Sequence, residues 1–350
     1  MSSIELVGGW SSVIAQLVSG EHLSSADAEV AMTAILRGEA QPSQIAAFVI
    51  ALRAKGESAD ELQGMLAAVI GASGVVELPD NIAARAIDIV GTGGDKSHSV
   101  NISTMASLVV AGAGIPVCKH GNRAASSQCG TADVLEALGI AIDLDGAGVA
   151  TCVTQAGMGF CFAPTFHPAF RHAGPTRKEL GVPTAFNLLG PMANPAKVSY
   201  MVVGVGNPSS AHSMVAAIKS RGVQRAWVVH GHGGLDELSL SGPCHVVELR
   251  DGLINEFSID AKDLGLQPAD VTAVRGGDPA YNAAVVRKTL AGEKGAVRDI
   301  VLLNAAAGLV VAGLAPNMTE GLDRAAGSID SGAASNALDK LIAVSSSVAR

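Results

Sequence analysis

The sequence is poor in the features that mark several classes of protein. Only 3% of its 350 residues are aromatic and 16% are charged, and five cysteines stand at positions 118, 129, 152, 161 and 244 with no Cys-x-x-Cys pair. Such scattered cysteines argue against a disulfide framework or a structural zinc site, so we expect them in the core. The N-terminus lacks the basic and apolar regions of a signal peptide, and no apolar run is long enough to span a membrane. These absences predict a soluble cytoplasmic protein.

Positive charge is also scarce. The formal net charge is −8, which argues against nucleic acid or an anionic membrane surface as the main partner, although a local basic pocket remains compatible with it. Hydrophobic residues make up 48% of the chain. A chain of this length and composition can build a large core and about two domains.

The first 72 residues show only helical patterns. Ser24 and Ser43 are placed to cap two helices, Gly56 to end the second, and Ser58 with Glu61 forms a capping box before a third. The helix around 45–53 is apolar almost all round, which predicts burial or a subunit contact.

From about residue 84, short apolar runs alternate with helices. The runs begin at 86, 115, 158, 199 and 225, and helices are predicted over 102–112, 130–138 and 209–221. This alternation predicts an α/β domain with a largely parallel sheet. Residues 236–259 resemble hairpins with turns at 242–243 and 251–252, and the C-terminal residues form helices. Residues 167–195 interrupt the rhythm with prolines and charge. We therefore expect an α-helical domain of residues 1–72, joined in space by 167–195, and an α/β domain of residues 73–166 and 196–350.

A glycine-rich loop follows the first predicted strand. The stretch GTGGD, residues 91–95, lacks the dinucleotide-binding spacing of glycines and lacks a Walker lysine. An ordinary turn needs a single glycine. Three glycines before a helix that begins with Asn101, Ser103 and Thr104 indicate a cradle for an anion such as phosphate.

A second loop carries cationic residues. Lys119, His120 and Arg123 follow the next predicted strand, with Ser126, Ser127 and Thr131 close behind. A solvated turn is the plainer reading, but loops after parallel strands converge on one crevice. Two anion sites in one crevice indicate a substrate with two phosphate groups.

Adjacent carboxylates offer a metal site. Asp236 and Glu237 follow a glycine turn and could hold Mg²⁺ together with substrate phosphates. A charged surface loop is the alternative. His230 and His232, just before them, offer a third reading, a zinc or iron hydrolase site, which needs further ligands from other strands.

No nucleophile motif is present. The chain has no Gly-x-Ser-x-Gly elbow, and no cysteine lies in a recognisable catalytic frame. Two phosphate sites with an acidic pair therefore predict displacement of a diphosphate group assisted by charge neutralisation.

Four stretches together resemble the anthranilate phosphoribosyltransferase family: GTGGDKSHSVNIST, KHGNRAASS, RKELGVPTAFNLLGPMANP and GLDELS. The resemblance runs through essentially the whole chain. It implies an N-terminal α-helical domain plus an α/β domain of the nucleoside phosphorylase/phosphoribosyltransferase type, and a homodimer joined through the helical parts. It implies transfer of the phosphoribosyl group from 5-phosphoribosyl 1-diphosphate to the amine of anthranilate, in tryptophan biosynthesis, with Mg²⁺ as the cofactor and two ions per subunit.

The resemblance also assigns residues. Anthranilate would contact Gly91, Asn122 and Arg177, and Mg²⁺ would contact Ser103, Asp236 and Glu237. The phosphoribosyl diphosphate would contact the two loops, through Gly91, Gly94, Asp95, Ser99, Asn101, Ile102, Ser103, Thr104, Lys119, His120, Gly121, Asn122, Arg123, Ala124, Ala125, Ser126, Ser127 and Thr131.

Some positions depart from the family's common pattern. His232 and Gly233 stand where an acidic residue is frequent, Phe170 replaces a tyrosine or methionine, and GPMANP lacks the usual leucine-threonine pair. These departures concern the acceptor site. His120 is the candidate for a general base, although the neutral aryl amine has little need of one. A pyrimidine nucleoside phosphorylase-like enzyme and a non-catalytic nucleic-acid-binding relative are the alternative functions.

Overall fold

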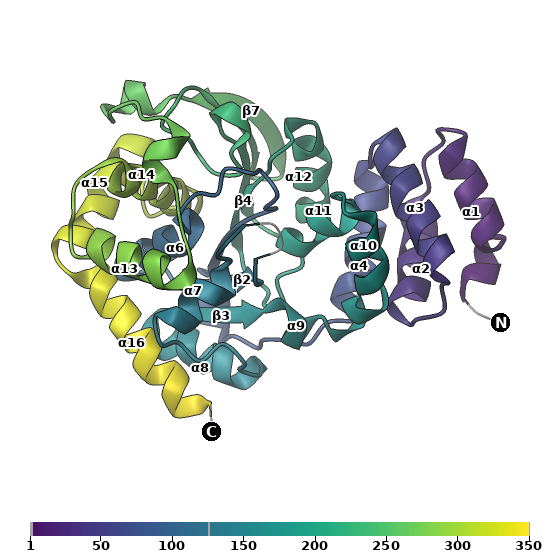
Figure 1. Ribbon diagram of the computed structural model, residues 1–350, viewed down its shortest axis with the longest axis horizontal. Helices are drawn as coiled ribbons and strands as arrows, with labels where there is room; N and C mark the ends of the chain where they lie inside the picture. Colours follow the sequence, from purple (N-terminus) through teal and green to yellow (C-terminus); the bar gives the residue numbers. More distant parts are fainter. Residues whose placement is uncertain (1–2, 125–126, 350) are drawn as a thin grey trace.

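The computed structural model describes residues 3–124 and 127–349, and they form a small helical lobe beside a larger lobe that contains a sheet (Figure 1). The small lobe contains the N-terminal helices, which are η1 (Ser3–Val7), α1 (Gly9–Val18), α2 (Ser25–Leu36), α3 (Pro42–Lys55) and α4 (Ala59–Gly71). Helix α1 packs on α3, and α2 packs on α4. The predicted all-helical N-terminal region is confirmed.

Helix ends in this lobe follow the sequence signals with one exception. Ser24 caps α2, Gly56 ends α3, and Ser58 caps α4, as predicted. The prediction that Ser43 opens α3 is wrong: Gln41 is the capping residue. Pro42 occupies the first helical position because its fixed φ suits a helix start and its missing N–H costs nothing there.

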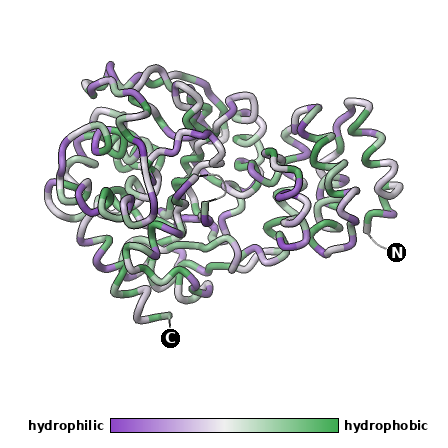
Figure 2. The backbone as a smooth tube through the Cα atoms, in the orientation of Figure 1, coloured by the Kyte–Doolittle hydropathy of each residue, from purple (hydrophilic) through white to green (hydrophobic). Residues whose placement is uncertain are grey.

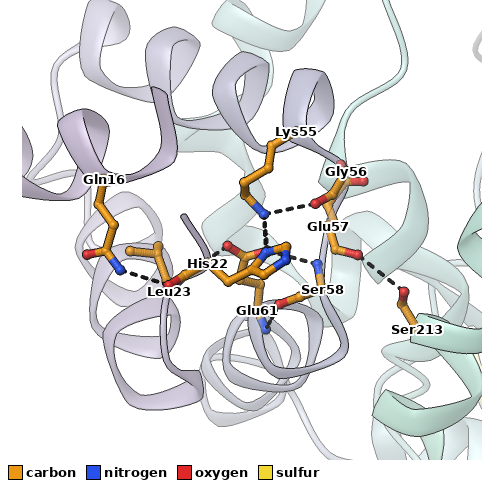
Figure 3. Close-up of polar contacts among 9 residues, drawn as sticks. All are labelled: Gln16, His22, Leu23, Lys55, Gly56, Glu57, Ser58, Glu61 and Ser213. Atoms are coloured by element: carbon orange, nitrogen blue, oxygen red, sulfur yellow. Dashed lines mark hydrogen bonds and ion pairs between the residues drawn. The ribbon is translucent and has the colours of Figure 1, made fainter. Parts of the chain in front are cut away.

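Glu61 ties three helix ends together (Figure 3). Its fully buried carboxylate accepts hydrogen bonds from the backbone N–H groups of Leu23 (3.0 Å) and Ser58 (2.8 Å) and from Lys55 Nζ (2.8 Å). Those donors lie at the start of α2, the start of α4 and the end of α3. Burial alone would raise the pKa of Glu61, but Lys55 and the two N–H groups outweigh burial and lower it. The Ser58–Glu61 capping box thus also joins α2 to α3.

The large lobe is built on a seven-stranded sheet with the order β3-β2-β1-β4-β5-β6-β7. Its strands are β1 (Ile87–Gly91), β2 (Val117–Gly121), β3 (Met158–Phe162), β4 (Tyr200–Gly204), β5 (Arg225–His230), β6 (Cys244–Arg250) and β7 (Leu253–Ile259). Strands β1 to β5 are parallel, and β6 and β7 are antiparallel to their neighbours. The predicted α/β fold with a mostly parallel sheet is confirmed. The chain leaves β1 toward β2 and later returns to β4 on its other side, which creates a crevice where the strands end.

The predicted hairpin region is only partly correct. The turn at Asp251 and Gly252 joins β6 to β7, and both residues have positive φ. Residues 236–243, expected as a strand and turn, form an irregular segment instead. The side chain of Asn304 replaces a strand partner, because its Oδ1 accepts from the Leu238 N–H and its Nδ2 donates to the Leu238 carbonyl, both at 2.9 Å.

The remaining helices cover the sheet and link the lobes. They are α5 (Asp80–Ala83), α6 (Ile102–Gly112), α7 (Thr131–Ala137), α8 (Gly146–Ala156), α9 (Ala163–Phe166), η2 (Pro168–His172), α10 (Gly174–Leu180), α11 (Ala185–Met192), η3 (Pro208–Ser210), α12 (Ala211–Ser220), η4 (His232–Gly234), η5 (Ala261–Leu264), η6 (Val271–Val274), α13 (Pro279–Leu290), α14 (Ala296–Val311), α15 (Met318–Asp330) and α16 (Ala333–Val348). Helices α8 and α15 were not predicted individually, because their glycines weaken the helical pattern.

Helices α6, α8 and α14 contact the sheet strands from the side that α15 and α16 then cover, while α12 contacts β5 and β6. Hydrophobic stretches run through both lobes in Figure 2, and the buried apolar residues form one continuous core. Among the described residues no helix is long and apolar enough to cross a membrane.

Residues 167–195 lie against the small lobe. Helix α10 packs on α3, η2 packs on α2, and α11 packs on α3 and α4. Helix α12 also packs on α4, and Ser213 Oγ donates to the Glu57 carbonyl at 3.2 Å. The two lobes are therefore joined through α4, α11 and α12.

Candidate active site

The site lies where β1, β2 and β4 end, and two glycines make room for it. Gly91 and Gly204 pair with each other at the ends of β1 and β4. A Cβ atom on either residue would approach Asp236 more closely than side chains tolerate, its Oδ2 in the case of Gly91 and its backbone carbonyl in the case of Gly204. The absence of side chains at these two positions lets the segment with Asp236 cross the strand ends.

Backbone N–H groups hold the acidic pair. Gly93 N–H donates to Asp236 Oδ2 at 2.7 Å, and Ser103 N–H, at the start of α6, donates to Glu237 Oε1 at 3.1 Å. Burial raises the pKa of both carboxyls. The Asp95 charge raises that of Asp236 further, and the Asp236 charge does the same for Glu237. The glycine loop and the N-terminus of α6 thus contact the acidic pair directly.

The charge of a third carboxylate, that of Asp95, therefore acts on the acidic pair. Asp95 Oδ2 is buried and has no hydrogen-bond partner among the described residues. Carboxylate oxygens with unmet charge and a nearby hydroxyl, that of Ser103, are the donor set that Mg²⁺ prefers. The residues present fit a magnesium site.

Lys119 lies beneath the acidic pair. Its side chain is almost fully buried, and Nζ donates to the carbonyl of Ile89 and, at 3.3 Å, to Ser103 Oγ. Burial lowers the pKa of Lys119, while the charges of Asp88, Glu237 and Asp236 oppose that shift. A cation so placed can neutralise phosphate or the carboxylates at the strand ends.

Asp88, which the sequence reading missed, anchors the start of the cationic loop. It lies inside β1, fully buried, and its two oxygens accept from the His120 N–H (3.2 Å) and from Asn194 Nδ2 (2.7 Å). Burial raises the pKa of Asp88 to about 6. A charged residue inside a short apolar strand was the available signal. Asn194 also donates to the Cys118 carbonyl at 2.7 Å, so it links the end of residues 167–195 to β2.

The glycine loop has an unusual backbone. Gly93, Gly94, Lys96 and His98 all have positive φ, a region that lysine and histidine seldom adopt. Asp95 Oδ1 accepts from the Ser97 N–H at 3.1 Å. Such strain persists where the surroundings enforce it, and it often accompanies binding sites. Ser99 also lines a small cavity of about 70 Å³ with Ser127, Cys129, Arg275 and Asn282.

In the cationic loop, Arg123 is bound to carboxylates of α7. Arg123 forms ion pairs with Asp133 (3.0 Å) and Glu136 of α7, which raise its pKa. Ala124 N–H donates to Asp133, and the Asn122 carbonyl accepts from the Ala132 N–H. Gly121 packs against Thr131. Arg123 must therefore leave two carboxylates to reach a phosphate. Ala125 and Ser126 lie outside the described residues.

A row of rings connects the end of β2 to α10. His120 contacts His167, which stacks on Phe170, and Phe170 meets Phe186 edge to face, with ring centroids 4.9, 5.4 and 5.4 Å apart. Arg177 continues the row, because its guanidinium lies over the Phe186 ring at 4.9 Å. The structure thus connects Arg177 to the strand end that Asn122 follows.

Both ring nitrogens of His120 are engaged, Nδ1 with the Gly190 carbonyl (3.0 Å) and Nε2 with His167 Nε2 (3.1 Å). Burial, and then the His167 charge, lower the pKa of His120 well below its usual value. Burial lowers that of His167 to about 4. With no free lone pair directed at the site, His120 is poorly placed as a general base.

The histidines of the hydrolase alternative have other partners. His230 Nδ1 donates to the Val205 carbonyl at 2.8 Å, and His232 packs against Gly242. Within residues 3–124 and 127–349, no set of His, Cys, Asp or Glu side chains joins these histidines to complete a zinc or iron site.

The helical lobe, the parallel sheet and the glycine loop facing an acidic pair define a class of glycosyl transferases. Residues 11–73 match the family described as "Glycosyl transferase family, helical bundle domain", and residues 83–335 match its "a/b domain". The chain belongs to the anthranilate phosphoribosyltransferase branch of that family. A protein of this name from Salinispora arenicola is 53% identical over 97% of both chains, and one from Roseiflexus castenholzii is 51% identical over 95% of this chain and 97% of its own.

Solved structures agree with this assignment. The anthranilate phosphoribosyltransferase of Thermus thermophilus superposes with a TM-score of 0.89 at 40% identity, covering 95% of this chain and 99% of its own. The Saccharomyces cerevisiae enzyme, in complex with PRPP and Mg, has a TM-score of 0.87 at 29% identity, with 97% of this chain and 98% of its own covered.

Proposed function

We propose that the chain transfers the 5-phosphoribosyl group from 5-phosphoribosyl 1-diphosphate to the amine of anthranilate. The amine nitrogen bonds to C1 of the ribose while the bond from C1 to the diphosphate oxygen breaks, and the nitrogen then loses a proton. The acidic pair carries the proposal, because Gly93 and Ser103 hold Asp236 and Glu237 beside the buried Lys119 at the crevice. Relatives of this name, about 50% identical over nearly their full length, support it.

Two loops would bind the phosphoribosyl diphosphate. We assign the glycine loop and the α6 N-terminus to it, through residues 91, 94, 95, 99 and 101–104, because glycine-rich loops and helix N-termini are the backbone features that bind phosphate. We assign residues 119–127 and Thr131 to the remaining phosphate. Arg123 would exchange its carboxylate partners for phosphate when the substrate binds.

Magnesium would neutralise the diphosphate. We propose Ser103, Asp236 and Glu237 as its protein ligands, with two ions per subunit. The metal supplies charge neutralisation of the leaving group. Lys119 adds a fixed positive charge from below, and the N–H groups of Gly93 and Ser103 keep the carboxylates oriented. The yeast enzyme, which was solved with PRPP and Mg, supports the binding of magnesium.

The acceptor would bind through Arg177, Asn122 and Gly91. A guanidinium grips a carboxylate through two parallel hydrogen bonds, and anthranilate carries a carboxylate beside its amine. The partly buried ring of Phe170 offers an apolar surface for the benzene ring. The yeast structure in complex with 4-fluoroanthranilate, 28% identical to this chain, supports an aryl acceptor.

One assay tests the reaction. Purified protein with phosphoribosyl diphosphate and Mg²⁺ should abolish anthranilate fluorescence as the product forms, and omission of either should prevent the loss. No loss beyond the enzyme-free control would overturn the assignment. Thymidine or uridine with inorganic phosphate should give no free base, which separates this function from a pyrimidine nucleoside phosphorylase.

We further propose a homodimer joined through the small lobe, residues 1–72 with 167–195, and a cytoplasmic enzyme. Leu6, Val18 and Ile50, on η1, α1 and α3, are 78%, 72% and 38% exposed, and apolar side chains so exposed favour a protein contact. The multiply charged substrate does not cross membranes unaided, which favours the cytoplasm. Sedimentation of the wild type and of Val18→Glu tests the dimer: the wild type should have twice the mass of the chain, and the variant should dissociate.

A further inference from the structure

Asn282 lines the small cavity beside Ser99 and is assigned to neither substrate above. It lies on α13, a helix of the C-terminal region, and its side chain is 2% exposed. Its Nδ2 donates to Asn101 Oδ1 at 2.9 Å, although the two residues are 181 positions apart. Asn101 is the residue before α6, where we place the phosphoribosyl diphosphate.

The hydrogen bonds fix which way both amides face. The Gly277 N–H can only donate, and it donates to Asn282 Oδ1 at 2.8 Å, so Nδ2 of Asn282 must point to Asn101. At the other end, Asn101 Nδ2 donates to the Cys129 carbonyl, which can only accept, at 3.3 Å. Each of the two amide side chains therefore has a single allowed orientation, and both orientations are consistent with the hydrogen bond from Asn282 to Asn101.

The orientation of the Asn101 amide determines whether it can bind an anion. An asparagine side chain offers an oxygen or an NH₂ group with almost the same shape, and only the NH₂ group attracts phosphate. With Oδ1 of Asn101 occupied by Asn282 and one N–H by Cys129, the second N–H of Asn101 is left for a ligand. Asn101 caps no backbone group of α6 with its side chain, so the helix itself does not fix the amide.

The same segment also supports the glycine loop. Gly276 N–H donates to the His98 carbonyl at 2.8 Å, and Val100 N–H donates to the Val274 carbonyl at 2.9 Å. Residues 274–277 therefore run alongside the end of the loop. Asn282 joins this segment to the start of α6, because it accepts from Gly277 and donates to Asn101.

We infer that Asn282 is a positioning residue for phosphoribosyl diphosphate, which turns the amide of Asn101 so that its NH₂ group faces the substrate. The inference rests on the proposed contact of Asn101 with this substrate. It extends the site to residues 274–282.

A double-mutant cycle tests the inference. Asn282→Ala should raise the KM for phosphoribosyl diphosphate roughly five- to tenfold, about the value of one hydrogen bond, and leave the KM for anthranilate unchanged. Asn101→Ala should have an effect of similar size. The double variant should resemble Asn101→Ala alone, because Asn282 acts through Asn101.

Asp278→Ala is the matched control. Asp278 caps α13 by accepting from the Tyr281 N–H at 2.8 Å and has no bond to Asn101. This variant should lower the melting temperature and leave the KM for phosphoribosyl diphosphate unchanged, whereas a raised KM in it would assign the effect to α13 as a whole and overturn the inference.

The outcomes separate the two proposals. A normal KM in Asn101→Ala would overturn the proposed substrate contact itself. A raised KM in Asn101→Ala with a normal KM in Asn282→Ala would overturn the positioning role alone, as would effects of the two substitutions that simply add.

Discussion

Arg177 has the surroundings of a residue that selects a ligand. Its guanidinium lies on Phe186, half-buried, and burial lowers its pKa without depriving it of charge. A surface arginine paired with a neighbouring carboxylate such as Glu179 would instead be solvated. The stacked position leaves the edge of the guanidinium open to a carboxylate.

Arg177→Ala should therefore weaken anthranilate use by roughly 1.5–3 kcal/mol, a loss in kcat/KM of about tenfold to slightly more than a hundredfold. The KM for phosphoribosyl diphosphate should barely change, and the preference for anthranilate over aniline should shrink. Lys178→Ala, an exposed neighbour on α10, is the control and should behave as wild type. An unchanged acceptor preference in Arg177→Ala would assign the carboxylate to another group.

The negative charges of Asp236 and Glu237 serve the proposed metal site, but their burial and mutual repulsion destabilise the folded protein without metal. Asp236→Asn with Glu237→Gln keeps an oxygen for the Gly93 and Ser103 N–H groups, so the fold should survive. Removal of two crowded charges should even raise the melting temperature in the absence of metal. Turnover should fall by two orders of magnitude or more, and added Mg²⁺ with diphosphate should no longer stabilise the protein in a thermal melt. Near-normal turnover at low Mg²⁺ would contradict the metal assignment.

At the scale of elements, the small lobe depends on how its helices end. Glu61 joins the starts of α2 and α4 to the end of α3 through one buried carboxylate. An amide at this position can accept from the N–H groups but cannot balance the charge of Lys55, whose side chain is only 6% exposed.

Glu61→Gln should lower the free energy of unfolding at pH 7 by about 2–4 kcal/mol, because it leaves a buried charge without its partner. The pKa of Glu61 is lowered in the folded state, so its contribution is complete above pH 4.5, the usual value, and is lost as the pH falls through the folded pKa. Chemical denaturation at pH 7 and pH 3.5 checks this: the difference between wild type and variant should narrow at the lower pH. Glu57→Gln serves as the control, because Glu57 forms no ion pair with Lys55 within the part of the chain that the structure describes.

Elements with local signals were predictable from the sequence. Ser58 and Glu61 gave α4 its start, and Gly91 to Asp95 gave the loop after β1, because caps and glycine turns depend on residues a few positions apart. Asn304 in place of a strand partner for Leu238 was not predictable, nor was Asn282 beneath Asn101, since neither pairing leaves a pattern within one segment. The same holds for Arg123, whose partners on α7 decide where it points.

At the scale of the whole molecule, His167 links the lobes. Its Nδ1 contacts Ser73 Oγ, just beyond α4, at 2.7 Å, and its Nε2 contacts His120 of β2. Both histidines are neutral at pH 7 because burial disfavours their charged forms. The contact between the lobes through Ser73, His167 and His120 is therefore uncharged at neutral pH.

Acid should consequently weaken this junction. The folded pKa of His167 is about 4 against a usual value of 6.5, so its contribution to stability is complete above pH 6.5 and is lost as the pH falls toward 4. The loss amounts to about 3 kcal/mol, since each pKa unit is worth about 1.4 kcal/mol. Denaturation curves of His167→Gln should show a smaller decline between pH 6.5 and 4.5 than wild type. A decline equal to wild type would contradict the assignment, and His172→Gln is the control.

The packing of α10 and α11 on the small lobe has a consequence for synthesis of the chain. Helices α3 and α4 leave the ribosome early, yet the helices that cover them follow only after β1, β2 and β3. At about 5–20 residues per second, the apolar surface that they cover waits several seconds for its partners. During that interval the nascent N-terminal segment is a natural client for chaperones, and it acquires its final shape only after a large part of the sheet has been made.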